Sequence, residues 1–171
     1  MRAFGCMKCD LDAPCSKLLC SKDAASCVST KGADRIPHMP KSPRYTPDHA
    51  AAGLDHKFPE IETWPNQFPG YEIVVDDPEF TSVCPKTGLP DFGVLKIQYM
   101  PDKACLELKS LKEYLQSYRN LGIFQENVVN QVLEDVVKWA KPVWAEVRGE
   151  FRPRGGIATT IAARWPRPKK R

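Results

Sequence analysis

Apolar and polar residues alternate in a strand pattern between residues 70 and 110 of the 171-residue chain. Residues 71–75 are rich in β-branched and aromatic side chains, and residues 91–99 alternate in part, with apolar side chains at Phe92, Val94, Leu95, Ile97 and Tyr99. A shorter apolar run follows at 104–108. We therefore expect three strands here. Residues 76–90 should form a loop, because this stretch contains three prolines and a glycine.

The next part of the chain changes to helical periodicity. Apolar side chains recur at the spacing of one helix face, namely at Leu111, Tyr114, Leu115 and Tyr118. Asn120 and Gly122 are typical residues for the end of that helix. A second helix is predicted over 126–140, and Pro142 prevents its continuation. Residues 144–151 and 157–163 then read as two strands joined by a turn.

This order of elements defines the expected fold class. Strands grouped on both sides of a helix pair indicate an α+β domain, with an antiparallel sheet and two helices on one face. An open sheet of four or five strands leaves two unpaired edges. We therefore expect the subunit to form a homo-oligomer through those edges.

The first third of the chain lacks such periodicity. Residues 30–70 contain seven prolines, and five of the seven cysteines fall within residues 1–27. We expect residues 1–58 to form a poorly ordered extension rich in Cys and Pro, followed by a domain at 59–163 and a basic tail at 164–171. Cys6 and Cys9 have zinc-knuckle spacing, but the second pair is missing, so reduced thiols are favoured over a metal site.

The net charge of +4 comes from the two ends of the chain. Residues 61–163 carry 11 basic and 14 acidic side chains, which leaves no surplus for a nucleic-acid footprint. No window of about 18 apolar residues is present for a membrane helix, and no apolar signal segment follows Met1. These features predict a cytoplasmic protein without a membrane partner or direct nucleic-acid contact.

Cys84 is the first residue with candidate chemistry. All three histidines lie before residue 57, so the predicted domain has no imidazole for a catalytic triad. Cys84 lies in the loop between two predicted strands, Pro85 stiffens the chain behind it, and Asp91 follows as a candidate acid or base. The alternative is that Cys84 packs as a small buried apolar residue, and we interpret Cys105 in that way.

Two further segments are candidates for anion binding. Glu107 ends a strand, and Lys109, Ser110 and Lys112 begin a helix whose unpaired N–H groups attract a phosphate. The turn at 152–156, Arg-Pro-Arg-Gly-Gly, allows close backbone approach to a second phosphate. A solvated first helical turn and a plain hairpin are the alternatives. Gln125 and Glu126, at the start of the second helix, are suited to the paired N–H donors of a purine-like ring.

Together these segments resemble one enzyme family. Residues 80–92 (Phe-Thr-Ser-Val-Cys-Pro-Lys-Thr-Gly-Leu-Pro-Asp-Phe) look like the catalytic loop of the QueF-type NADPH-dependent 7-cyano-7-deazaguanine reductases, within the GTP cyclohydrolase I-like superfamily. Residues 107–115, 117–120 and 152–157 match further family segments in the same order. The resemblance covers about residues 65–160.

The resemblance implies a fold, a reaction and residue roles. The fold is a tunnelling fold (T-fold) that forms rings, with active sites between subunits and two stacked pentamers. The reaction reduces a nitrile to an amine with two NADPH in queuosine biosynthesis. The implied roles are nucleophile for Cys84, proton donor for Asp91, substrate binding for Leu106, Glu107, Leu108, Gln125 and Glu126, and NADPH binding for Lys109, Ser110, Lys112, Arg154 and Gly155.

One residue departs from the family pattern, and two alternatives stay open. Many members have His-Glu where this chain has Gln125-Glu126, and glutamine cannot take up a proton near neutral pH. A non-reducing enzyme of the same fold would form the same thioimide and pass it to ammonia or glutamine. A non-catalytic module would use only the purine pocket.

Overall fold

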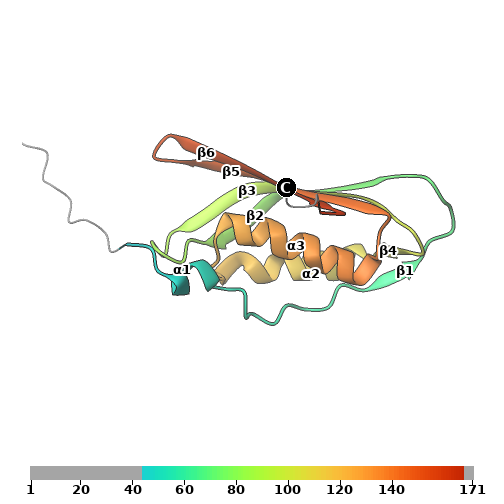
Figure 1. Ribbon diagram of the computed structural model, residues 1–171, viewed down its shortest axis with the longest axis horizontal. Coiled ribbons are helices and arrows are strands. Elements are labelled where there is room, and N and C mark those ends of the chain that lie inside the picture. Colours follow the sequence, from blue (N-terminus) through green and yellow to red (C-terminus); the bar gives the residue numbers. More distant parts are fainter. Residues whose placement is uncertain (1–43, 168–171) are drawn as a thin grey trace, which may run out of the picture. The chain divides into compact units, whose positions relative to one another are not determined.

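The computed structural model describes residues 44–167, which fold into strands and helices in one compact unit (Figure 1). The elements, in chain order, are α1 (Pro47–Ala51), β1 (Thr63–Pro65), β2 (Ile73–Val83), β3 (Pro90–Met100), β4 (Ala104–Leu106), α2 (Leu108–Gln116), the 3-10 helix η1 (Ser117–Asn120), α3 (Gln125–Ala140), β5 (Trp144–Arg154) and β6 (Ile157–Trp165). This content confirms the α+β prediction.

A four-stranded antiparallel sheet forms one layer, with strand order β2-β3-β5-β6. Helices α2 and α3 lie side by side and cover one of its faces (Figure 1). The sheet has four strands, the lower of the two predicted numbers, because the predicted strand at 104–108 is not part of it. Strand β4 pairs instead with β1 in a separate two-stranded sheet, and β1 lies in the proline-rich stretch where no strand was predicted.

Strand β2 is longer than its sequence pattern suggested. It continues to Val83 and pairs with β3 along most of that length, so the predicted loop at 76–90 shrinks to residues 84–89. A register shift between Asp77 and Phe80 falls where Pro78 interrupts the strand. A bulge tolerates a proline that has no N–H for the ladder, so the proline there does not end the strand.

The core lies between the sheet and the two helices. The predicted stripe on α2 is buried at Leu111, Tyr114 and Leu115, and α3 buries a row of valines against the sheet. Alternate residues of β3 are also buried, including Leu95, Ile97 and Tyr99. This two-layer packing holds α2 and α3 against the sheet, and the N-terminal ends of both helices carry candidate site residues.

Residues 44–58, the last part of the predicted extension, are ordered against the domain. Thr46 caps α1 through a capping box, and Asn127 of α3 donates a hydrogen bond to the Ala50 carbonyl at 2.8 Å. The Phe58 ring stacks on Tyr118 with 4.5 Å between ring centres. The domain therefore begins before residue 59, because aromatic and helix-capping contacts tie this segment down. Residues 1–43, with the five early cysteines, lie outside the described residues.

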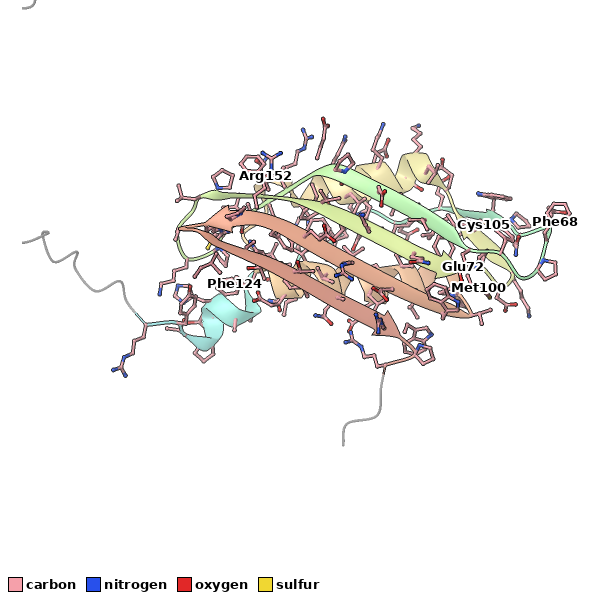
Figure 2. The ribbon with its side chains drawn as sticks, turned by 90° about the horizontal axis from the view of Figure 1, so that it is seen from above. Phe68, Glu72, Met100, Cys105, Phe124 and Arg152 are labelled. Atoms are coloured by element: carbon pink, nitrogen blue, oxygen red, sulfur yellow. The ribbon has the colours of Figure 1, made fainter. Side chains whose placement is uncertain are left out.

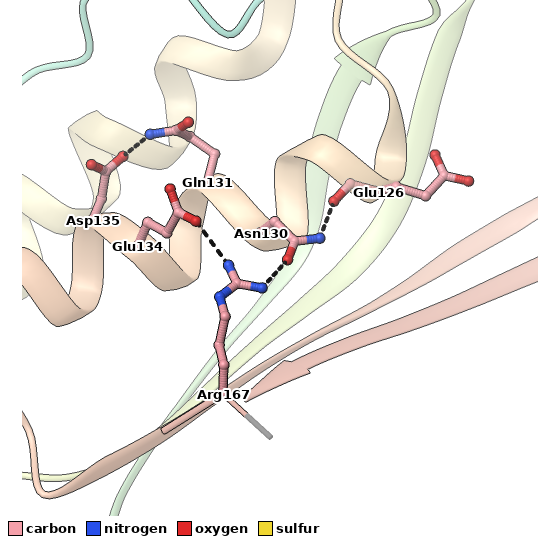
Figure 3. Close-up of polar contacts among 6 residues, drawn as sticks. All are labelled: Glu126, Asn130, Gln131, Glu134, Asp135 and Arg167. Carbon is pink, nitrogen blue, oxygen red and sulfur yellow. Dashed lines mark hydrogen bonds and ion pairs between the residues drawn. The ribbon is translucent and has the colours of Figure 1, made fainter. Parts of the chain in front are cut away.

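The chain end also contacts the domain. Arg167 donates hydrogen bonds to Asn130 at 2.9 Å and to Glu134 at 2.8 Å on α3 (Figure 3). The start of the predicted basic tail is thus held on a helix, and residues 168–171 lie outside the described residues. None of the helices between residues 44 and 167 is long and apolar enough to cross a membrane.

Candidate functional site

Cys84 lies in a tight loop that connects β2 to β3. The Cys84 amide donates to the Leu89 carbonyl at 2.9 Å, and the Gly88 amide donates to the Cys84 carbonyl at 2.9 Å. Gly88 has a φ of +68°, a left-handed conformation that glycine adopts without strain. These bonds hold the loop closed around the cysteine.

The same loop is fastened to the segment that leads into α3. The Val83 amide donates to the Leu121 carbonyl, and the Ile123 amide donates to the Val83 carbonyl, each at 3.0 Å. Phe124 then serves as the N-cap of α3. This connection brings Cys84 next to Gln125 and Glu126, although about forty positions separate them in the sequence.

A pocket of about 390 Å³ opens at this junction. It brings together five of the predicted site residues, namely Cys84, Asp91, Gln125, Glu126 and Arg154. Arg152 and Ile157, which also line the pocket, belong to the segment at 152–157 that the sequence singled out, whereas the sequence did not indicate Tyr45, Phe124 and Thr159. Tyr45 comes from the segment before the predicted domain, so no local pattern pointed to it.

Asp91 is a buried acid at the start of β3. Only 3% of it is exposed, and its carboxylate forms an ion pair with the Arg154 guanidinium. Arg154 is the last residue of β5 and reaches Asp91 from the rim of the pocket. The family resemblance implies that Arg154 binds NADPH, whereas in this structure Arg154 contacts the predicted acid.

The Cys84 thiol is poised to ionise near neutral pH. Burial alone raises its pKa, but hydrogen bonds from the hydroxyl and amide of Thr87, from Arg154 and from the Lys86 amide outweigh that effect. The pKa of Cys84 is lowered to about 7. A large fraction of Cys84, which is 3% exposed in this structure, is therefore the thiolate at neutral pH, and the thiolate is the nucleophilic form.

We predict that the alkylation rate of Cys84 by iodoacetamide rises with pH through a midpoint of about 7. A Thr87→Val variant loses the hydroxyl that stabilises the thiolate, so its midpoint moves to higher pH. Stopped alkylation followed by mass spectrometry gives both midpoints. Thr81→Val, which removes a hydroxyl from β2, is the matched control, and an equal midpoint in all three proteins would contradict this account.

The start of α2 holds the second group of predicted residues. Glu107 is the N-cap, and its carboxylate accepts hydrogen bonds from the amides of Lys109 at 2.8 Å and Ser110 at 2.7 Å. The Ser110 hydroxyl donates to the Glu107 carbonyl and accepts from the Glu62 amide, each at 3.0 Å. These N–H groups were predicted to bind a phosphate, and in the structure Glu107 already occupies them.

Hydrogen bonds from the amides of Ser110 and Lys109 lower the pKa of Glu107. Because this group has a lower pKa in the folded state, it stabilises the fold above its ordinary pKa, and that stability is lost as pH falls through the folded-state value. We therefore predict that Glu107→Ala lowers Tm at pH 7 and that the difference from the native protein shrinks in acid.

Glu113→Ala is the matched control for this prediction, because Glu113 is an exposed glutamate of the same helix. Thermal melts at several pH values compare the three proteins. A Glu107→Ala variant that melts with the native protein at pH 7 would show that the cap contributes nothing.

The remaining predicted residues lie around this second group. Leu108 and Lys112 line a different pocket of about 350 Å³ between β2 and α2. Lys109 is exposed, and Leu106 is 3% exposed in the core. Figure 2 shows Cys105, next to this group, toward one end of the sheet and Phe124, beside Cys84, at the other. Within one chain, the predicted site is therefore divided into two separate groups.

Cys105 plays the packing role that the sequence suggested. It is fully buried, and its sulfur lies 3.3 Å from the Tyr71 hydroxyl. That hydrogen bond and burial raise the pKa of Tyr71 to about 12. Among residues 44–167, no group of three or more candidate ligands is arranged for a metal ion.

These features define an α+β protein that presents an activated thiol beside a buried carboxylate in an open pocket. Its fold is shared with the crystal structure of the archaeosine synthase QueF-Like in the apo form, with a TM-score of 0.51, 24% identity, and coverage of 54% of this chain and 91% of that one. The family model described as QueF-like protein matches residues 90–170.

Close relatives make the assignment specific. The chain is 58% identical over 122 residues to the NADPH-dependent 7-cyano-7-deazaguanine reductase of Elusimicrobium minutum, covering 71% of this chain and 92% of that protein. It is 54% identical over 111 residues to the protein of the same name from Chloroherpeton thalassium, covering 64% and 96%. The chain belongs to the family of NADPH-dependent 7-cyano-7-deazaguanine reductases.

Proposed function

We propose that this chain reduces the nitrile of 7-cyano-7-deazaguanine to the aminomethyl group with NADPH, by way of a thioimide on Cys84, in queuosine biosynthesis. The observation that carries the mechanism is the pocket that Cys84 and Asp91 line together, and the hydrogen bonds that lower the pKa of the thiol to about 7 agree with it. The reaction itself is inferred from the family, in which a reductase is 58% identical to this chain over 122 residues.

Cys84 performs the first chemical step. Its sulfur lone pair forms a bond to the nitrile carbon, one π pair of the C≡N bond moves to nitrogen, and the nitrogen takes up a proton. The product is a thioimide, whose C=N carbon accepts a hydride more readily than a nitrile does. The lowered thiol pKa supplies the thiolate that this step needs.

Asp91 is the residue we propose as proton donor to that nitrogen. A buried carboxyl group beside the reacting atoms can hold a proton without losing it to water. In this structure Arg154 pairs with Asp91, and that contact favours the charged carboxylate. Arg154 must therefore withdraw from Asp91 before Asp91 acts as an acid.

The residues proposed for NADPH fit its charge. Lys109 and Lys112 are exposed cations at the start of α2, and Arg154 adjoins Gly155, which has open space around it and a φ of +55°. The Ser110 amide is already bonded to Glu107, so the lysine side chains carry most of the phosphate contact in this proposal. Two NADPH molecules, bound in turn, would supply one hydride each.

The deazaguanine ring is proposed to bind at the start of α3. Glu126 lines the Cys84 pocket, and its exposed carboxylate makes no hydrogen bond to another side chain among residues 44–167 (Figure 3). A free carboxylate there accepts paired N–H donors from a purine-like ring. Gln125 adds amide contacts, and we assign Leu106, Glu107 and Leu108 to the ring's other edge.

That assignment requires a second subunit, because within one subunit the two groups of residues lie toward opposite ends of the sheet. We propose T-fold rings, with two stacked pentamers and active sites between subunits. The strands β2 and β6 are the free edges of the sheet and supply pairing surfaces. The net charge of −3 over residues 61–163 fits a free base as substrate in the cytoplasm, without nucleic acid.

Mixing two inactive variants tests the shared site. Cys84→Ala and Lys112→Ala subunits are unfolded together and refolded, so that some interfaces combine a native Cys84 with a native Lys112. Recovery of part of the activity supports sites between subunits. Mixed oligomers without recovered activity would contradict them.

The function itself is tested by the covalent adduct. Incubation with 7-cyano-7-deazaguanine without NADPH should add the mass of one substrate molecule to each chain and produce a thioimide absorbance. Peptide mapping should place the added mass on Cys84. A protein that binds the nitrile without any mass increase would contradict the proposed mechanism.

A further inference from the structure

Ser82 is a buried serine whose side-chain hydroxyl has no hydrogen-bond partner among residues 44–167. Its exposed fraction is 0%. Buried hydroxyl groups in native proteins nearly always have a partner, because an unpaired one forfeits its hydration without compensation. Ser82 is the one buried side chain in this part of the chain with such an atom.

The position of Ser82 connects it to both proposed catalytic residues. Phe80, Ser82 and Cys84 are buried at alternate positions along β2 and its continuation, so they face the same side of the sheet. In the neighbouring strand, Asp91 is the direct partner of Ser82. Directly paired residues of antiparallel strands place their Cβ atoms about 5 Å apart on one face.

Asp91 has a second carboxyl oxygen that can accept from another partner. Its ion pair with Arg154 involves Oδ1, and Arg154 reaches it with a side chain that is 43% exposed. The other ionisable groups that line the same pocket are Tyr45, Cys84, Glu126 and Arg152. A partner that approaches through solvent-exposed atoms can leave, whereas Ser82 is fixed in a strand behind the carboxyl group.

We propose that Ser82 is a positioning residue for Asp91: its hydroxyl donates a hydrogen bond to one carboxyl oxygen once substrate fills the pocket and Arg154 withdraws. The other carboxyl oxygen then carries the proton toward the substrate nitrogen. When Asp91 gives up that proton, Ser82 stabilises the carboxylate that remains. A donor built into a strand needs no rearrangement of solvent at that moment.

This inference rests on the proposed function, and its test separates the two. The experiment measures kcat and KM for the nitrile, at several pH values, in the native protein, Ser82→Ala, Ser82→Thr and Ser117→Ala. Thr keeps the hydroxyl. Ser117 donates to the Tyr114 carbonyl at 2.6 Å outside the Cys84 pocket, so its variant controls for loss of a serine hydroxyl. Cys84 alkylation in each variant reports whether the loop remains intact.

Ser82→Ala should lower kcat about tenfold to a hundredfold, leave KM within about twofold, and shift the pH limb of Asp91 upward, because the carboxylate loses a donor. Ser82→Thr should recover most of the rate, and Ser117→Ala should match the native protein. An unchanged kcat in Ser82→Ala, or an equal loss in the alanine and threonine variants, overturns the role of Ser82. A native protein that consumes no NADPH contradicts the proposed function itself.

Discussion

Cys84→Ala should form no thioimide and should reduce kcat for nitrile reduction by at least about a thousandfold. The loss is this large because the variant has no atom to add to the nitrile carbon, and later steps depend on that bond. Substrate binding should survive, since the proposed ring contacts lie on other residues. Absorbance of the adduct, NADPH consumption and calorimetric binding of the nitrile measure these three effects.

Cys105→Ala is the matched control for this prediction. Cys105 is fully buried and bonds to Tyr71 outside the Cys84 pocket, so its loss should lower Tm while leaving kcat near the native value. If Cys84→Ala kept native turnover, Cys84 would not be the nucleophile. If Cys105→Ala abolished turnover in a folded protein, the loss in Cys84→Ala would not be specific to the proposed nucleophile.

Asp91→Asn should lower kcat about a hundredfold to ten thousandfold, the range expected for loss of a general acid. The amide has the size of the carboxyl group and cannot deliver an acidic proton, so packing is retained while proton transfer is lost. It also frees Arg154 from its ion pair. Steady-state rates, together with the alkylation rate of Cys84, distinguish a lost acid from a damaged thiol.

Asp102→Asn is suited as the control for Asp91→Asn, because Asp102 is an exposed acid in the turn between β3 and β4. Its variant should retain native kcat and KM. Native turnover in Asp91→Asn would remove Asp91 from the mechanism and, with it, the role proposed for Ser82.

Local patterns in the sequence were sufficient for most of the fold. The two helices appear because apolar residues recur at helical spacing, and both are buried on the expected faces. Strand β2 was predicted too short because Pro78 reads as a break, and only its pairing with β3 shows that the break is a register shift. The separate β1–β4 pair depends on contact between segments forty residues apart.

The sequence indicated only those candidate site residues whose side chains have a characteristic chemistry. Cys84, Asp91 and Glu126 were identified from their segments, and the structure brings them to one pocket. The amides at the start of α2 were expected to bind an anion. No sequence pattern revealed that the Glu107 carboxylate accepts hydrogen bonds from the amides of Lys109 and Ser110. Ser82 gave no signal at all, since an unpaired hydroxyl is a property of three-dimensional surroundings.

The predictions for the two ends of the chain differ from the structure at residues 44–58 and at Arg167. The segment at 44–58 was assigned to the extension because it lacks periodicity, yet Tyr45 lines the Cys84 pocket and Phe58 packs on Tyr118. Single aromatic residues anchor this segment, and such contacts leave no periodic trace. Arg167 likewise binds α3, although the sequence shows only a basic run.

The ratio of NADPH consumed to amine formed tests the central claim most directly. The purified chain, mixed with 7-cyano-7-deazaguanine and excess NADPH, should oxidise two NADPH for each 7-aminomethyl-7-deazaguanine released, because a nitrile needs two hydrides to become a primary amine. Loss of absorbance at the NADPH band gives the first quantity, and chromatography of the product gives the second. A thioimide on Cys84 that forms without any NADPH oxidation would contradict the account and indicate a non-reducing enzyme of this fold.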